Sequence, residues 1–110
     1  MKAGPLLALV AFAAALPGGA GAHMARSGWS YDSWCCGGQD CQPIASVNVS
    51  VTDAGYLVSI PEGGHGAAPG VHQKLFGYDE VQRSGDGEYH ACILPNSNEF
   101  RCLYVPEFTY

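Results

Sequence analysis

Residues 47–60 read VNVSVTDAGYLVSI, and the spacing of apolar side chains in this stretch decides the fold class. Large apolar residues recur at every second position on both sides of a turn at residues 52–55, and the residues between them are Asn48, Ser50, Leu57 and Ser59. Pairing Val51 with Tyr56 places six large apolar side chains on one face: Val47, Val49, Val51, Tyr56, Val58 and Ile60. A slip of one residue would mix the two faces, so the pattern predicts an antiparallel hairpin with a specified register and one buried face.

A second hairpin is predicted near the C-terminus, where residues 88–94 and 100–105 are apolar runs around a turn centred on Ser97. This register pairs Leu94 with Phe100, Cys92 with Cys102 and His90 with Tyr104. The other face of the same strands is also apolar. A strand pair that is apolar on both faces is typical of the middle of a small sandwich, or of a sheet covered by loops.

The segments between the hairpins carry weaker signals. Residues 61–72 form a Gly/Pro-rich loop, residues 74–78 could be a short strand, residues 79–83 a helical turn or a further strand, and residues 84–87 a turn. We therefore expect a mainly β fold: a small, disulfide-stabilised antiparallel sheet or sandwich, built from two hairpins with long irregular loops.

The N-terminal residues predict export. Lys2 precedes an unbroken apolar run from Leu6 to Leu16, Pro17 breaks that run, and small residues follow at 20–22. This is the arrangement of a secretory signal peptide, and the run is shorter than the roughly 20 residues that span a bilayer. We expect residues 1–22 to be removed, leaving residues 23–110 as a single secreted or periplasmic domain without a transmembrane anchor.

The net charge of this domain limits the classes of molecule that it could bind. Without Lys2, four Lys and Arg residues remain against ten Asp and Glu, a net charge of −6 with His neutral. Such a surface repels phosphate backbones and anionic lipids, and the sequence contains no basic cluster. Nucleic acid is therefore not expected as a partner, whereas a protein or a glycan is compatible with the charge.

Five cysteines in a short exported domain predict a disulfide framework with one cysteine left over. Cys36 and Cys41 could close a six-residue loop, and Cys92 lies opposite Cys102 in the predicted hairpin. That assignment leaves Cys35 as the odd cysteine, which could join two copies of the chain. Five cysteines allow 15 ways of forming two disulfides, so spacing alone does not decide the connectivity.

Two groups of residues are candidates for binding. A closed Cys36–Cys41 loop would present Gln39 and Asp40 to a partner. It is similar to the constrained inhibitory loop of a periplasmic lysozyme inhibitor family, although Gln39 stands where that loop carries His. The second group, which could form a sugar-stacking platform, is Trp29, Tyr31 and Trp34. The commoner roles of such features are a structural disulfide for the loop and packing over disulfides for the aromatic residues.

A metal site is an alternative. If export leaves His23 at the N-terminus, its α-amine and imidazole together could chelate copper, with His65 and His72 as further ligands. Both of those histidines lie in the Gly/Pro-rich region, where a ligand and a solvated residue look identical in sequence. A structural zinc site is not expected, because Cys92 and Cys102 do not have the usual ligand spacing.

The order of motifs resembles a family of small secreted, cysteine-rich proteins of α-proteobacteria. The residues that carry this resemblance are 29–31, 35–43, 84–93, Cys102, Tyr104 and Pro106. The resemblance implies an exported single domain and no particular activity. The sequence shows no nucleophile motif and no acid/base pair of carboxylates, so we expect a binding or structural module rather than an enzyme, with no cofactor.

Overall fold

The computed structural model describes residues 24–95 and 97–107. The predicted signal peptide and His23 lie outside the described residues. Within the described part of the chain, no helix is long and apolar enough to cross a membrane.

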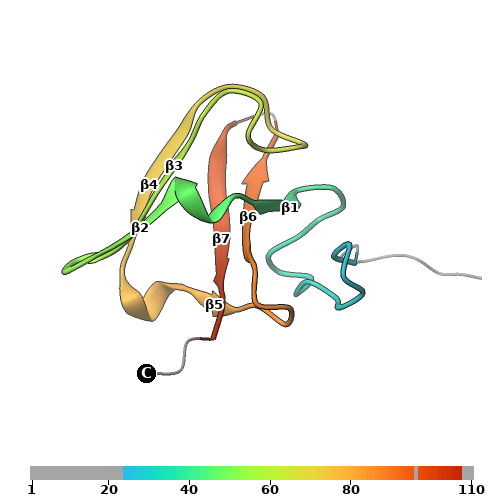
Figure 1. Ribbon diagram of the computed structural model, residues 1–110. Coiled ribbons are helices and arrows are strands. Elements are labelled where there is room, and N and C mark those ends of the chain that lie inside the picture. The colour runs from blue at the N-terminus through green and yellow to red at the C-terminus, as the bar shows by residue number, and fades with distance from the viewer. Residues whose placement is uncertain (1–23, 96, 108–110) are drawn as a thin grey trace, which may run out of the picture.

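The fold is mainly β and consists of two sheets, as predicted (Figure 1). The first sheet is antiparallel in the order β2-β3-β4; the second has the order β1-β6-β7-β5, and only β5 and β7 pair in parallel. The strands are β1 (Cys41–Ile44), β2 (Val49–Thr52), β3 (Gly55–Ile60), β4 (His72–Phe76), β5 (Gln82–Arg83), β6 (Tyr89–Leu94) and β7 (Glu99–Val105). Two short 3-10 helices, η2 (Ser46–Asn48) and η3 (Tyr78–Glu80), lie in the connections.

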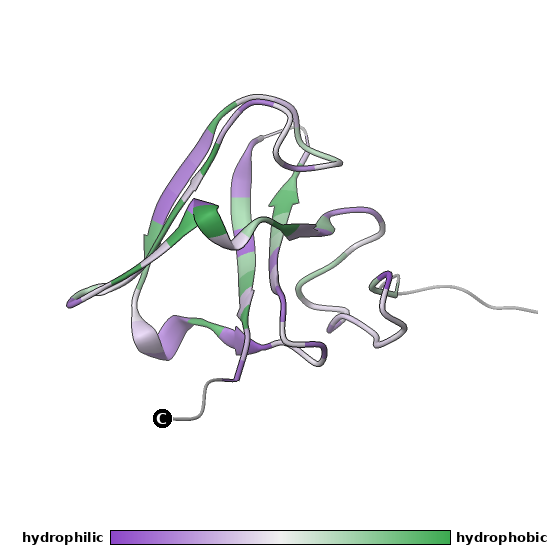
Figure 2. Ribbon diagram, viewed as in Figure 1, coloured by the Kyte–Doolittle hydropathy of each residue, from purple (hydrophilic) through white to green (hydrophobic). Residues whose placement is uncertain are grey.

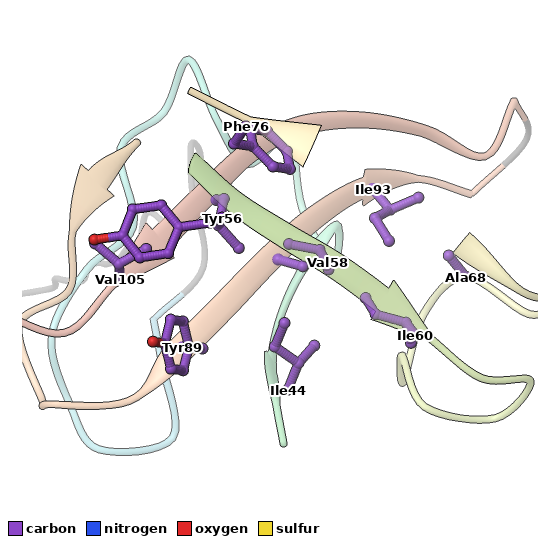
Figure 3. Close-up of a cluster of buried hydrophobic side chains, with 11 residues drawn as sticks. Ile44, Tyr56, Val58, Ile60, Ala68, Phe76, Tyr89, Ile93 and Val105 are labelled. Atoms are coloured by element: carbon purple, nitrogen blue, oxygen red, sulfur yellow. The ribbon is translucent and has the colours of Figure 1, made fainter. Parts of the chain in front are cut away.

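The main hydrophobic core lies between the two sheets. Figure 3 shows β3 crossing over the β6–β7 hairpin with apolar side chains between them. Val58, Ile60 and Ile93 are fully buried there, and each contributes about 1.5–3 kcal/mol to folding. In Figure 2 the middle of β4 is hydrophilic, in agreement with the exposure of Gln73 and Lys74.

The register predicted for the first hairpin is confirmed, because Val49 pairs with Val58 and Val51 with Tyr56. The predicted burial of its first strand is wrong for Val47 and Val51, whereas Val49 packs against the core. Val47 belongs to η2 rather than to the strand and is 86% exposed, and Val51 is 55% exposed. β2 is an edge strand, which leaves these two side chains open to solvent.

Gly55 is required at the turn of this hairpin. Its φ is +139°, and an added Cβ would lie 2.0 Å from the carbonyl oxygen of Phe76 on β4. The Thr52 hydroxyl accepts a hydrogen bond from the Ala54 N–H and donates one to the Gly55 carbonyl, which fixes the turn. The turn therefore depends on a glycine at position 55, both for its conformation and for the close approach of β4.

In the second hairpin, the strand register agrees with the prediction as far as Cys92 and is shifted by one residue after it. His90 pairs with Tyr104 and Cys92 with Cys102, but Ile93 pairs with Phe100 across a β-bulge. The predicted pairing of Leu94 with Phe100 is therefore wrong by one residue. The bulge turns the Phe100 side chain toward the main core, where its ring packs 5.4 Å from that of Phe76.

The disulfides differ from the predicted pairs. Cys41 is linked to Cys92, and Cys35 is linked to Cys102. The predicted Cys36–Cys41 and Cys92–Cys102 bridges are wrong, and the cysteine outside the disulfides is Cys36 rather than Cys35. The cause is the pairing of β1 with β6, which places Cys41, Cys92 and Cys102 in one row across three neighbouring strands. Cys92 turns to Cys41, and Cys102 is left for Cys35.

This connectivity predicts a thiol count. Unfolding the protein without reduction should expose one thiol, that of Cys36. In the folded protein its side chain is fully buried, so a thiol reagent should react with it far more slowly. Thiol titration in the presence and absence of denaturant measures both quantities. Two or more thiols in the unfolded, unreduced protein would contradict the connectivity.

The burial of the Cys36 side chain also affects the predicted dimer. A disulfide between two copies of the chain through Cys36 would require local opening of the fold.

Candidate functional site

The residues before β1 form a third layer, which we call the capping segment (residues 24–40). Figure 1 shows it in cyan on the side of β6 and β7 away from the β2–β3–β4 sheet. The two faces of the β6–β7 hairpin are therefore both covered, as its sequence predicted. Beneath the capping segment lies a second buried cluster composed of Ala25, Tyr31, Cys35, Cys36, Cys41, Cys92, Cys102 and Tyr104.

The two disulfides hold the end of this segment on both sides. Cys35 is tied to β7 and Cys41 to β6, so residues 36–40 form a five-residue loop clamped at each end. Arg101, the residue inserted at the β-bulge, donates a hydrogen bond of 2.6 Å to the Trp34 carbonyl beside the first clamp. The predicted closed hexapeptide is thus replaced by a loop that is anchored to two strands.

A buried chain of hydrogen bonds joins the capping segment to β6. Nε2 of His90 lies 2.9 and 3.0 Å from the two carboxylate oxygens of Asp86, and Nδ1 lies 2.8 Å from the Tyr31 hydroxyl. His90 is 1% exposed. The Ser27 hydroxyl and the Glu88 N–H also donate to Asp86, so both oxygens of this carboxylate accept hydrogen bonds.

The electrostatics of this chain set the proton states of Asp86 and Tyr31. Burial raises the pKa of Asp86, but the hydrogen bonds from Ser27, His90 and the Glu88 N–H lower it by more, and the net pKa is well below the ordinary value. Burial, together with the nearby Asp86 charge, raises the pKa of Tyr31. Asp86 is therefore an ionised acceptor for the His90 Nε2–H, and Tyr31 remains a neutral phenol.

The order of groups in this arrangement resembles a nucleophile relay, in which a base activates a hydroxyl. The hydroxyl here belongs to Tyr31, a side chain that is only 3% exposed. Tyr104 behaves in the same way: burial raises its pKa, and its hydroxyl donates to Asp32 at 2.8 Å while accepting from the Asp32 N–H. These tyrosines attach the capping segment to the sheet.

The predicted aromatic platform is not formed. Trp29 and Tyr31 pack edge to face with centroids 5.0 Å apart, and both rings also contact His90 and Tyr104. Tyr31 is 3% exposed, so it offers no face to a sugar. Trp34 is not part of this cluster and is 57% exposed. Packing over the disulfides, the alternative weighed for these residues, is the arrangement observed for Trp29 and Tyr31.

The two residues predicted to be presented by the loop have different environments. Gln39 is exposed, as expected. Asp40 is buried, and its carboxylate accepts a hydrogen bond of 3.1 Å from the Gly37 N–H. Asp40 is therefore part of the loop's internal structure, and only Gln39 is available for contact with a partner.

Two cavities lie beside the capping segment and share Arg26 and Pro43. The first, of about 200 Å³, is lined by Met24, Arg26, Tyr31, Gln39, Cys41, Gln42 and Pro43. The second, of about 330 Å³, is lined by Arg26, Ser27, Pro43, Asp86, Glu88 and His90. Sequence reasoning named Gln39 and Tyr31 but missed Arg26, Asp86 and Glu88, because nothing in the local sequence shows that the 84–88 turn lies beside residue 26.

The two histidines of the predicted Gly/Pro-rich region, His65 and His72, both make hydrogen bonds within the fold. His65 Nε2 donates to the Ala91 carbonyl at 2.8 Å, and Nδ1 accepts from the N–H groups of Ala67 and Ala68. A metal would have to displace these bonds. His72 is buried and donates from Nε2 to the Ala68 carbonyl. In the part of the chain that the structure describes, no three His, Cys, Asp or Glu side chains are grouped so as to hold a metal ion.

The comparisons with known proteins identify no relative. The chain matches no protein-family model, and neither a curated protein nor a solved structure matches it significantly.

The hydrogen bond between Tyr31 and His90 should stabilise the fold measurably. Replacing Tyr31 by Phe leaves the buried Nδ1 of His90 without its partner, and we expect a loss of about 1–3 kcal/mol in the free energy of unfolding. Tyr56→Phe is the matched control, because the Tyr56 hydroxyl makes no hydrogen bond to another described residue. Urea unfolding measures both, and equal losses in the two variants would contradict the assigned role.

His65 should make stability depend on pH near neutrality. Burial lowers its pKa below the ordinary value of 6.5, so the unfolded chain binds a proton at a higher pH than the folded chain does. Its contribution is fully present above pH 6.5 and is lost as the pH falls. We expect the free energy of unfolding to decrease between pH 7.5 and 5.5, and to decrease less in His65→Asn, whose amide oxygen can replace the Nδ1 acceptor without titrating. Identical pH profiles would contradict this.

Proposed function

We propose that this chain is an exported binding module that works in the periplasm or outside the cell. The apolar run at residues 6–16 supports export. The two disulfides support it independently, because such bonds form and persist in oxidising compartments. The resemblance to small secreted α-proteobacterial proteins points to the same compartment.

The observation that carries the binding proposal is the clamped capping segment beside its two cavities. A surface that is already rigid loses little conformational entropy when a ligand binds. The disulfides of Cys35 and Cys41 and the hydrogen bonds of Tyr31 and Asp32 provide that rigidity here. Arg26, at the junction of the two cavities, and the exposed Gln39 supply polar groups for recognition.

Binding is favoured over catalysis because the hydrogen-bonded chain Asp86–His90–Tyr31 attaches the capping segment to β6. Its tyrosine is only 3% exposed, and both oxygens of its carboxylate accept hydrogen bonds from within the protein. A copper-binding role would rest on His23 with other ligands. His65 and His72, the two candidates for those ligands, are both bonded within the fold.

Export is tested by an intact-mass spectrum of the protein recovered from the periplasm or the culture fluid. The expected mass is that of residues 23–110 less four hydrogens for two disulfides. The same spectrum, recorded under native conditions, reports any molecule that remains bound. Recovery of the full-length chain in the cytoplasm would overturn the export part of the proposal.

Binding is tested by amide NMR spectra of the domain titrated with panels of peptides, amino acids and soluble glycans. We expect at least one class of compound to shift resonances of residues 24–43 and 86–90 in a saturable way. Gln39→Ala and Arg26→Ala should weaken that binding, while Gln73→Ala on the exposed part of β4 should not. Shifts confined to other regions, or equal losses with Gln73→Ala, would contradict the location of the site.

A further inference from the structure

The larger cavity carries opposite charges that do not neutralise each other. Arg26 and Glu88 both line this cavity of about 330 Å³, and both are exposed. Within residues 24–95 and 97–107, no Lys or Arg side chain is paired with an Asp or Glu, and neither the Arg26 guanidinium nor the Glu88 carboxylate makes a side-chain hydrogen bond. Both charges thus remain available to a ligand.

The other polar side chains that line this cavity already make hydrogen bonds within the protein. Asp86 accepts hydrogen bonds from Ser27, from the Glu88 N–H and from His90, and His90 is bonded at both ring nitrogens. These groups form a fixed polar wall. The negative charge of Asp86 lies in the same turn as Glu88 and adds to the attraction for a cation there. Pro43 provides an apolar contact on the wall that the two cavities share.

We infer that this cavity binds a small zwitterion, with a carboxylate at Arg26 and an ammonium group at Glu88. The inference rests on the proposed binding function and specifies its ligand class. A free amino acid and a dipeptide with both termini unblocked share this chemistry, and the cavity lies at the small end of the usual range of ligand sites. A neutral zwitterion also suits the domain as a whole, because its net charge of −6 repels simple anions.

The ligand side of the test uses four compounds: L-leucine, L-alanyl-L-alanine, its N-acetyl derivative and its C-terminal amide. Calorimetric and NMR titrations of the mature, oxidised domain give the dissociation constants. We expect one or both of the unblocked compounds to bind. If the dipeptide is the preferred ligand, each blocked dipeptide should bind at least about tenfold more weakly than alanyl-alanine. Preference for leucine over the dipeptide would identify a free amino acid as the ligand.

The protein side uses Arg26→Gln and Glu88→Gln, with Arg83→Gln and Glu62→Gln as controls that make the same charge changes at exposed positions outside both cavities. Arg26→Gln should weaken the binding of the preferred unblocked compound and abolish any preference for a free carboxylate over the amide. Glu88→Gln should abolish any preference for a free amine over the acetylated form. The control variants should retain wild-type affinities, and amide spectra confirm that all four variants are folded.

Three results would overturn the inference. The first is equal binding of blocked and unblocked compounds, and the second is a loss of affinity in the control variants as large as that in Arg26→Gln and Glu88→Gln. The third is a folded domain that binds neither unblocked compound at a concentration of about 10 mM, which is tenfold above the dissociation constant of 1 mM that corresponds to about 4 kcal/mol of binding free energy. These results are distinguishable from failure of the proposed function. If other compounds still shift residues 24–43 and 86–90, the domain is a binding module with a different ligand class.

Discussion

Removal of either disulfide is expected to destabilise the domain by about 4 kcal/mol, estimated from the loss of loop-closure entropy. The bonds join residues 67 and 51 positions apart, so each restricts most of the unfolded chain. A domain of this size has a total stability of about 5–15 kcal/mol. We therefore expect Cys35→Ala/Cys102→Ala and Cys41→Ala/Cys92→Ala each to lower the urea midpoint strongly, and the removal of both bonds to leave the chain unfolded.

The single variant Cys36→Ala is the matched control, because it removes a buried cysteine side chain and leaves both disulfides intact. Its cost should be about 1 kcal/mol, the loss of one small buried side chain. If a paired variant does not fold, stepwise reduction of the native protein followed by thermal unfolding gives the same comparison. A loss in Cys36→Ala equal to that in the paired variants would contradict the role given to the disulfides.

Gly55→Ala is expected to destabilise the domain by about 3–5 kcal/mol, at the upper end for a single substitution. The added methyl would meet the Phe76 carbonyl oxygen at 2.0 Å, and the residue must also hold a φ of +139°. Relief of this clash requires β4 to move away from β3, which disturbs the pairing of Tyr56 with Phe76. Thermal and urea unfolding measure the loss.

Gly63→Ala separates the two causes. Gly63 also has a positive φ, of +82°, but no atom lies within 4 Å of its added Cβ. It should therefore show only the backbone strain, about 1–2 kcal/mol. If the two variants lost the same stability, the close approach of Phe76 would contribute nothing. If Gly55→Ala were as stable as the wild type, the turn described for residues 52–55 would be wrong.

Much of the fold could be predicted because local patterns are strong in two places. The alternation around the 52–55 turn specified the pairing of Val49 with Val58, and the apolar runs around Ser97 specified that of Cys92 with Cys102. In each case the two strands are adjacent in sequence, so a short turn and a two-residue period leave few registers open.

The disulfides and the candidate site could not be predicted because they depend on contacts between distant segments. The CQPI sequence of β1 has no alternation, and Pro43 is acceptable there only because β1 is an edge strand. Its pairing with β6 decided the partner of Cys41. The same docking brought Tyr31 to His90, 59 positions away, and placed Arg26 beside the 84–88 turn.

The sequence by itself determined that this is a mainly β domain with two hairpins, an excess of acidic residues, and five cysteines of which four could form disulfides. Only the tertiary structure decided which cysteines pair, that Val47 and Val51 of the first hairpin are left exposed, and which charges line a common cavity. The physical reason is that alternation and turn chemistry act over a few residues. Disulfide partners, burial and charge environments are set by the packing of three layers whose members are far apart along the chain.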